Sequence, residues 1–175
     1  FTPLLLNLLS IIRNMLIEDF TYIKENLNDE IQNFNEKKIL ITGGTGFFGM
    51  NLVKTFKYLV ENEDLKCEIF ILSRNANDVK VKFRELSDLS YLHFINHDIS
   101  KPIILKNDID FVIHCATSAS KEINDNHFDQ MSRTIVNGTI NILDFCVQKK
   151  AKLLFISSGA VNGINESNNK IKPTD

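Results

Sequence analysis

Short apolar runs alternate with amphipathic stretches along most of the chain. Five of these runs have the length of a strand and are flanked by glycine or polar residues, a pattern typical of strands buried in a sheet. We therefore predict strands over residues 38–42, 67–73, 92–98, 110–116 and 152–158. Two longer stretches place apolar side chains on one helical face and predict helices over residues 47–62 and about 127–149.

The order of these elements predicts the fold class. Strands that alternate with helices indicate an α/β fold, here a Rossmann-like doubly wound parallel sheet with right-handed crossovers and helices on both faces. The connection over residues 76–89 is polar and only weakly helical, and the tail from Asn162 onward is typical of a loop. A chain of 175 residues is long enough for one such domain.

The residues before the first predicted strand have a different pattern. Apolar side chains recur at helical spacing, so residues 4–34 are expected to be helical and peripheral, with polar residues at 26–29 offering a break. Polar residues interrupt the first apolar stretch, and neither a membrane span nor a signal peptide is expected. We divide the chain into a helical extension, residues 1–36, and an α/β domain, residues 37–175. The sequence does not open with methionine, which suggests that further residues precede it.

Charge and composition bear on three properties: nucleic-acid binding, cellular location and metal binding. The formal net charge of −2 gives no electrostatic case for binding nucleic acid. Cys67, Cys115 and Cys146 are far apart and lie within apolar runs, which favours reduced core thiols and a cytoplasmic protein. The four histidines lack the spacing of metal ligands, so we predict no metal.

A glycine-rich turn follows the first predicted strand and opens the first predicted helix. Gly43, Gly46 and Gly49 are spaced as G-x-x-G-x-x-G. A strand, such a turn and a helix form the arrangement in which backbone N–H groups face a pyrophosphate. No Gly-Lys-Ser/Thr closes the run, which excludes an ATP-type P-loop. The alternative is a turn that only joins a strand to a helix, but the repeated strand–helix units favour a dinucleotide site.

The run ITGGTGFFG at 41–49 resembles the opening of extended short-chain dehydrogenases/reductases, the NAD(P)-dependent epimerase/dehydratase group. Four further segments are similar to motifs of that family and occur in the same order. They are NHDI at 96–99, DFVIHCAT at 110–117, NGTINIL at 137–143 and LLFISSGAVNG at 153–163. The third departs from the family motif by one displaced position.

The resemblance implies a set of site residues at the carboxyl ends of the strands. Considered alone, a turn position for Asp98, a core position for His114 and a helix-surface position for Asn137 are favoured, and only the order of the motifs and their placement at strand ends favour a site. The resemblance implies cofactor contacts by Gly43, Thr45, Gly46, Phe47, Phe48, Gly49, Ser73, Arg74, Asp98, Ile99, Cys115, Ala116, Thr117 and Asn137, and a catalytic role for Ser158.

The end of the second predicted strand bears on the choice between NAD and NADP. A carboxylate at this point accepts hydrogen bonds from the ribose 2′-OH of NAD, whereas an arginine accommodates the 2′-phosphate of NADP. Ser73 stands where an aspartate would select NAD, and Arg74 follows it. We favour NADP over NAD on charge. The alternatives are that Arg74 is a solvated loop residue or stacks on adenine.

Chemistry in the resembling family needs a Ser or Thr, a Tyr and a Lys. Ser158 matches the first, with Ser157 as a less favoured candidate, but no Tyr-x-x-x-Lys is present. Asn162 also stands where the family usually has Tyr. We interpret the sequence as part of a longer enzyme and expect this part alone to be inactive.

The resemblance therefore implies the cofactor-binding part of an epimerase, dehydratase or decarboxylase that acts on a nucleotide sugar by transient hydride transfer. The interrupted apolar pattern predicts no membrane association, and a homodimer of the full-length protein is a family expectation. One rival is an NADPH-dependent carbonyl reductase, which Arg74 would suit. Another is a non-catalytic dinucleotide-binding or sensor module, which the missing Tyr-x-x-x-Lys would suit.

Overall fold

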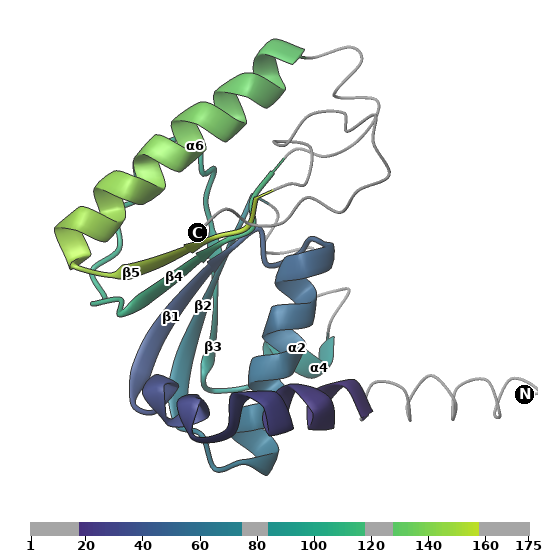
Figure 1. Ribbon diagram of the computed structural model, residues 1–175. Helices are drawn as coiled ribbons and strands as arrows, with labels where there is room; N and C mark the ends of the chain where they lie inside the picture. The colour runs from purple at the N-terminus through teal and green to yellow at the C-terminus, as the bar shows by residue number, and fades with distance from the viewer. Residues whose placement is uncertain (1–17, 75–83, 118–127, 158–175) are drawn as a thin grey trace, which may run out of the picture.

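A parallel sheet of five strands forms the centre of the described protein (Figure 1). The structure is a computed structural model and describes residues 18–74, 84–117 and 128–157. The strands are β1 (Lys37–Thr42), β2 (Cys67–Ser73), β3 (Leu92–Asn96), β4 (Phe111–His114) and β5 (Lys152–Phe155). Their spatial order is β3-β2-β1-β4-β5, which confirms the predicted Rossmann-like fold.

Two long helices cover opposite faces of this sheet (Figure 1). Helix α2 (Phe47–Asn62) joins β1 to β2, and helix α6 (Phe128–Lys149) leads from β4 to β5. A short helix, α4 (Arg84–Ser87), precedes β3 within the segment that was predicted to be weakly helical. Both long helices were predicted to within one residue.

The core is divided into two layers because alternate residues of a strand point to opposite faces of the sheet. Ile39 and Ile41 of β1 pack with the α2 residues Val53, Phe56 and Leu59. Leu40, between them, faces the other side and packs with the α6 residues Ile142 and Phe145. All three β1 residues are fully buried, as predicted for a strand covered on both faces. Strand β1 is therefore enclosed on both faces of the sheet.

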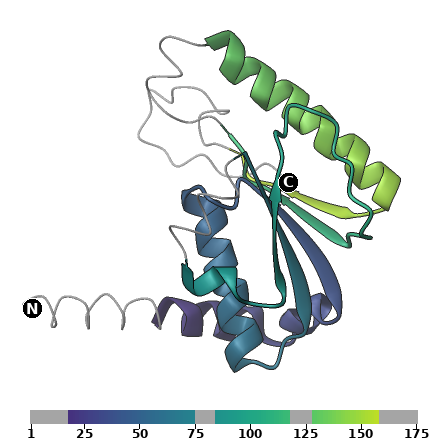
Figure 2. The same cartoon turned by 180° about the vertical axis from the view of Figure 1, so that it is seen from behind.

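The connection from β3 to β4 contains no helix in the structure. Residues 97–110 instead run alongside α6, as Figure 2 shows from behind, and their apolar side chains close one side of the core. The buried residues are Ile99, Ile103 and Ile109. Because this strap begins at the carboxyl end of β3, it brings Ile99 close to the glycine turn.

The described part of the N-terminal extension is helical. Residues 18–27 form an α-helix and η1 (Asn28–Phe34) continues as a 3₁₀ helix. Asn28 has a positive φ of 43°, which marks the predicted break at residues 26–29. Phe20 stacks on Tyr58 of α2 with 5.1 Å between ring centroids, and Ile31 is buried in the same core layer. The rest of the predicted helix, residues 4–17, lies outside the described residues.

Three strands end earlier than predicted. Strand β3 ends at Asn96 rather than at residue 98, because the Asp98 carboxylate accepts hydrogen bonds from Ser100 and turns the chain. Strand β4 ends at His114, the register partner of Thr42, where its neighbour β1 also ends. Strand β5 ends at Phe155 rather than at residue 158. These shorter strands leave the predicted site residues in loops.

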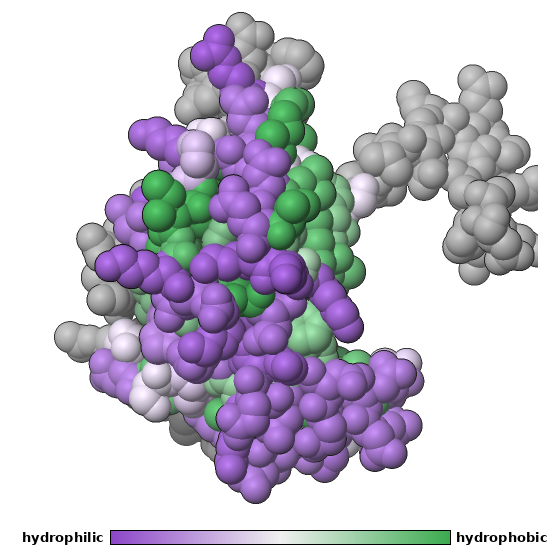
Figure 3. Space-filling model, turned by 90° about the vertical axis from the view of Figure 1, so that its left-hand side faces the viewer, coloured by the Kyte–Doolittle hydropathy of each residue, from purple (hydrophilic) through white to green (hydrophobic). Residues whose placement is uncertain are grey.

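The outer side of α6 and β5 is more apolar than expected of a surface (Figure 3). Val136, Ile140, Leu143 and Val147 are spaced four, three and four residues apart on α6, and each is about half exposed or more. Leu154 of β5 is 55% exposed. Within the residues described, no helix combines the length and the hydropathy needed to cross a membrane.

Candidate functional site

A cleft of about 420 Å³ lies at the carboxyl ends of the strands. It is bordered by the turn after β1, the end of β2, the strap after β3, the loop after β4 and the start of α6. Its lining residues are Gly43, Thr45, Gly46, Phe47, Phe48, Gly49, Leu72, Ser73, Arg74, His97, Ile99, Cys115, Ala116, Thr117 and Thr134. Twelve of the fourteen predicted cofactor-site residues are among them, so the structure brings most of the predicted set together around one cleft.

Close backbone approaches require the glycines at the two ends of the turn. Gly43 has a φ of 65°, and a Cβ there would lie 2.7 Å from the Cα of Ala116. A Cβ on Gly49 would collide with the carbonyl oxygen of Gly43. The turn therefore packs backbone against backbone, which leaves its inner surface open to a ligand.

The N-terminus of α2 is suited to hold an anion. Gly46 is the N-cap residue, and no side chain makes a capping hydrogen bond. The first turn also contains no acidic residue. The N–H groups of an uncapped first turn lack intrahelical partners and carry the positive end of the helix dipole. Because Gly46, Phe47 and Phe48 line the cleft, a diphosphate placed there would meet these donors.

A hydrogen-bonded pair lies beneath the glycine turn. The Oγ1 of Thr42, at the end of β1, lies 2.6 Å from Nδ1 of His114, at the end of β4. The same oxygen accepts a hydrogen bond from the backbone N–H of Ala116 at 3.3 Å. Burial lowers the pKa of His114, so the imidazole is neutral near pH 7. His114 is therefore a core residue adjoining the cleft, one of the two alternatives for it.

The end of β2 presents hydroxyl groups and one positive charge. Ser73 is largely buried, and its Oγ lies 3.3 Å from Oγ1 of Thr45. Arg74 follows with an exposed side chain. Among the described residues that line the cleft, none is Asp or Glu. A carboxylate that could accept hydrogen bonds from a ribose 2′-OH is therefore missing from this lining.

Asp98 lies in a turn beside the cleft but is not among its lining residues. Its Oδ1 accepts hydrogen bonds from the backbone N–H and the hydroxyl of Ser100, at 3.0 and 2.9 Å. These hydrogen bonds, together with the charge of Arg74, lower the pKa of Asp98. One carboxylate oxygen is thus engaged in forming the turn. Ile99, which follows, is buried and lines the cleft.

Helix α6 presents a different residue from the one predicted. Thr134, Gly138 and Asn141 lie on one face, at i, i+4 and i+7, and this face meets the strap. A Cβ on Gly138 would lie 3.1 Å from Ile99, and the amide of Asn141 donates to the carbonyl of Ile99 at 2.8 Å. Asn137 lies off this face and is exposed, whereas Thr134 is buried and lines the cleft.

Leu72, His97 and Thr134 line the cleft and were missed by the sequence reasoning. Leu72 and His97 adjoin predicted site segments at the ends of β2 and β3, so their position next to Ser73 and Asp98 was the available signal. For Thr134, the signal was the helical period counted back from Gly138. Cys115 lines the cleft, but burial raises the pKa of its thiol to about 11, which leaves it protonated. The predicted catalytic residue, Ser158, lies outside the described residues.

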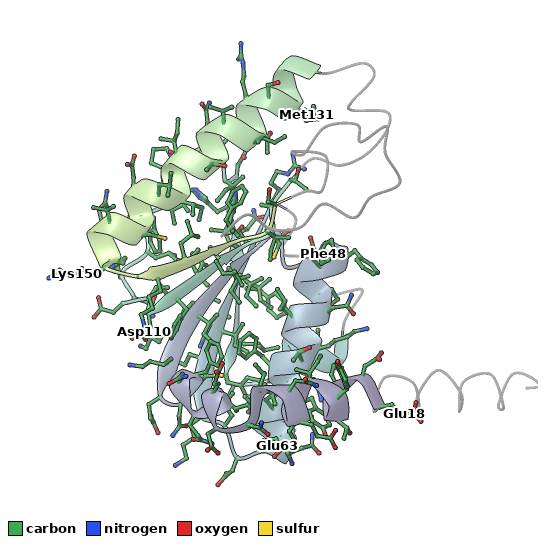
Figure 4. All side chains as sticks on the ribbon, in the orientation of Figure 1. Glu18, Phe48, Glu63, Asp110, Met131 and Lys150 are labelled. Carbon is green, nitrogen blue, oxygen red and sulfur yellow. The ribbon has the colours of Figure 1, made fainter. Side chains whose placement is uncertain are left out.

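A second hollow lies at the opposite end of the sheet, near the amino ends of β1 and β2. It has a volume of about 390 Å³ and is lined by residues of both charges, including Lys37, Lys66 and Glu36. Figure 4 shows the two ends: Phe48 and Met131 lie toward the carboxyl ends of the strands, and Glu63 lies at the other end. Ligands of open α/β sheets bind at the carboxyl end, which favours the glycine-lined cleft.

Comparisons with known proteins identify relatives of this chain. The chain is 32% identical over 141 residues to a UDP-N-acetylglucosamine 4,6-dehydratase (inverting) of Campylobacter jejuni, a match that covers 75% of this chain and 40% of the relative. It is 29% identical over 126 residues to UDP-glucuronic acid decarboxylase 5 of Arabidopsis thaliana, covering 72% of this chain and 35% of the relative. The chain thus spans well under half the length of these two relatives.

Solved structures share the fold. The Bordetella bronchiseptica enzyme WbmF in complex with NADH superimposes with a TM-score of 0.59 at 19% identity, over 79% of this chain and 40% of that chain. Residues 39–175 match the sequence pattern of the NAD dependent epimerase/dehydratase family. This match covers β1 from Ile39 onward, the other four strands and the whole glycine turn, and it establishes that the chain belongs to the NAD dependent epimerase/dehydratase family.

Proposed function

We propose that this chain is the dinucleotide-binding part of an enzyme that acts on a nucleotide-activated sugar. Family membership supports the dinucleotide, and relatives named as a UDP-sugar dehydratase and a UDP-sugar decarboxylase support the substrate class. The observation that carries the proposal is the uncapped N-terminus of α2, which lines the cleft together with the glycine turn. A free first turn beside closely packed glycines is what a diphosphate group needs.

Each described segment of the cleft would contribute to this binding in its own way. The α2 N-terminus would hold the diphosphate, and the buried Ile99 would pack against an adenine ring. Thr117 would lie near the reactive end of the cofactor, after β4. When bound, the dinucleotide supplies hydride transfer, and the protein supplies binding and orientation. Oxidation at the sugar C4 would be the common first step of epimerisation, dehydration and decarboxylation.

We further propose that NADP is preferred over NAD. Arg74 provides a positive charge at the end of β2, and Ser73 and Thr45 provide hydroxyl groups without a carboxylate that would repel a 2′-phosphate. Titrations of the chain with NADPH and NADH test this preference. Arg74→Asp should weaken NADPH binding by about tenfold or more and favour NADH. Tighter binding of NADH to the unaltered chain would overturn the preference and leave the dinucleotide site standing.

Activity requires the full-length protein, which we propose carries the Tyr-x-x-x-Lys pair in its C-terminal part. The test is to incubate it with UDP-glucuronic acid and with UDP-N-acetylglucosamine and to follow reduced nicotinamide by absorbance. Deuterium at the sugar C4 should slow the appearance of that signal. Ser158→Ala should reduce turnover on the order of 100-fold if Ser158 holds the reacting oxygen. A full-length sequence without Tyr-x-x-x-Lys, and without turnover, would favour the sensor alternative.

We also propose that two copies of the full-length protein pair through the outer face of α6. The exposed apolar residues of α6 repeat at the four-and-three spacing of a helix–helix seam. Sedimentation of wild type beside Leu143→Glu tests the pairing, with the neighbouring exposed Gln148→Glu as the matched control. Loss of the dimer in Leu143→Glu alone supports the proposal, and a monomeric wild type contradicts it.

The three cysteines are free, which supports a reducing, cytoplasmic location.

A further inference from the structure

The side chains of Thr42 and His114 form a buried contact directly beneath the cleft. Thr42 is fully buried and His114 is 3% exposed, and neither lines the cleft. They are the last residues of β1 and β4 and are register partners in the sheet. Each precedes a loop that does line the cleft. The contact therefore joins the two strand ends from which the cleft walls depart.

Hydrogen-bond roles within this contact can be assigned. The backbone N–H of Ala116 only donates, so the Thr42 oxygen is its acceptor at 3.3 Å. In the described part of the protein, the only other partner of this hydroxyl is Nδ1 of His114, at 2.6 Å. The hydroxyl proton is therefore directed at Nδ1, and the ring proton belongs on Nε2. Burial, which keeps the ring neutral, is consistent with an accepting Nδ1.

The two loops above this contact leave little room for independent movement. A Cβ on Gly43 would lie 2.7 Å from the Cα of Ala116, so their backbones are already in contact. The backbone N–H of Cys115 donates to the carbonyl of Thr42 at 3.1 Å. On its other side the imidazole packs against Phe155 of β5, with 5.4 Å between ring centroids. A displacement of the Thr42 side chain would therefore reach both walls of the cleft.

We propose that Thr42 and His114 form a latch that fixes the glycine turn and the loop after β4 relative to each other, so that dinucleotide affinity depends on the hydroxyl-to-imidazole hydrogen bond. This inference rests on the proposed dinucleotide function of the cleft. In this proposal, neither the Thr42 nor the His114 side chain touches the cofactor. Both are positioning residues that act through Ala116 and Gly43.

Paired substitutions separate the hydrogen bond from packing. Thr42→Val removes the hydroxyl and keeps the shape, whereas Thr42→Ser keeps the hydroxyl. His114→Phe keeps a ring against Phe155 without an acceptor, whereas His114→Asn keeps an acceptor near the position of Nδ1. Thr55→Val is the matched control, because the Thr55 hydroxyl donates to the carbonyl of Asn51 within α2, outside the cleft lining.

Dissociation constants of NADPH and NADH are measured for each variant by titration. We expect about tenfold weaker binding by Thr42→Val and His114→Phe, because each leaves a buried polar group without its partner. Thr42→Ser, His114→Asn and the Thr55→Val control should stay within about threefold of wild type. The opposite result would overturn the latch: near wild-type affinity in His114→Phe and weak binding in His114→Asn would show that affinity depends on the packing of the ring and not on the hydrogen bond.

Two measurements without cofactor keep the latch separate from the proposed function. Nitrogen NMR of the imidazole should place the ring proton on Nε2, and the amide of Ala116 should exchange faster in Thr42→Val than in Thr42→Ser. A ring proton on Nδ1 would overturn the latch even if dinucleotide binds. If wild type binds neither cofactor, the dinucleotide function and the affinity claim that rests on it both fail. If wild type and Thr42→Val bind equally well, the latch fails and the function stands.

Discussion

Strands β1 and β5 have similar sequences and very different surroundings. Strand β1 reads KKILIT and β5 reads KLLF, each a basic start followed by large apolar residues. Leu40 of β1 is fully buried, whereas Leu154 of β5 is 55% exposed. The difference arises from position, because β1 pairs with β2 and β4 and is covered by helices on both faces, whereas β5 pairs only with β4 within the described residues.

This difference explains where the cleft is built. The glycine turn departs from β1, the central strand of the described sheet, so its backbone is anchored by core packing on both faces. Strand β5 lies at the edge of the described sheet, but its Phe155 still contacts His114 of β4, the strand between β1 and β5. A similar apolar pattern therefore predicts a strand in both places, and only the sheet order tells the anchored strand from the exposed one.

The largest expected effect is at the centre of the sheet. Leu40→Ala should lower the free energy of unfolding by about 3 kcal/mol, because it removes a fully buried side chain and leaves a cavity between β1 and α6. Urea unfolding of wild type and variant measures the change. A loss below about 1 kcal/mol would mean that β1 is not enclosed as described.

An intermediate effect is expected from pH at the Thr42–His114 contact. Burial lowers the pKa of His114 in the folded state below the unfolded value of about 6.5. The unfolded chain therefore binds more protons in the window between these two pKa values. Stability contributed by His114 is complete above about pH 6.5 and falls as the pH drops toward the folded pKa, by at most about 1.4 kcal/mol per pH unit.

The comparison of wild type with His114→Phe isolates this contribution. Among the described residues, Thr42 and Phe155 are the partners of the imidazole, and neither is charged, so burial is the cause of its pKa shift. Urea unfolding across this pH range should show a smaller loss on acidification for the phenylalanine variant. Parallel pH profiles for the two proteins would show that His114 is not a buried neutral imidazole.

The smallest effect is expected at the edge of the sheet. Leu154→Ala makes the same chemical change as Leu40→Ala on a half-exposed side chain, so stability should change by less than about 1 kcal/mol. Unfolding of both variants under identical conditions gives the contrast directly. Equal losses would show that β5 is covered in solution by something that the described residues do not include.

Periodicity and turn chemistry were sufficient to predict much of the fold. Strand β2 was predicted with its observed limits, and β1 and both long helices to within one residue. The parallel sheet with helices on both faces also followed from the alternation of strands and helices. The ends of β3, β4 and β5 did not follow, since each depends on a tertiary partner or a turn. The Ser100 hydrogen bonds to Asp98, which end β3, are one such case.

The candidate site was predictable where backbone motifs define it. The glycine turn and the ends of β2 and β4 lie at the cleft as predicted, because the carboxyl ends of parallel strands share one edge. Helix α6 was less predictable, since a displaced motif position changes the helical face. Asn137 is therefore exposed, while Thr134 lines the cleft. The Thr42–His114 contact joins residues far apart in sequence, and only the strand register reveals it.

Gly46→Val gives the most direct test of the dinucleotide site. Gly46 has an ordinary φ of −78°, and a Cβ there would lie 3.3 Å from its nearest neighbour, the carbonyl oxygen of Gly43. This contact is tight, and relieving it needs a shift of a few tenths of an ångström in the Gly43 carbonyl. We expect the variant to fold with a modest loss of stability, and its side chain would occupy the anion-facing start of α2. Titration of wild type and variant with NADPH and NADH should show at least about 100-fold weaker binding to the variant, while urea unfolding checks that the variant is folded under the conditions of the titration. Equal affinity of the two proteins for both cofactors would contradict the assignment.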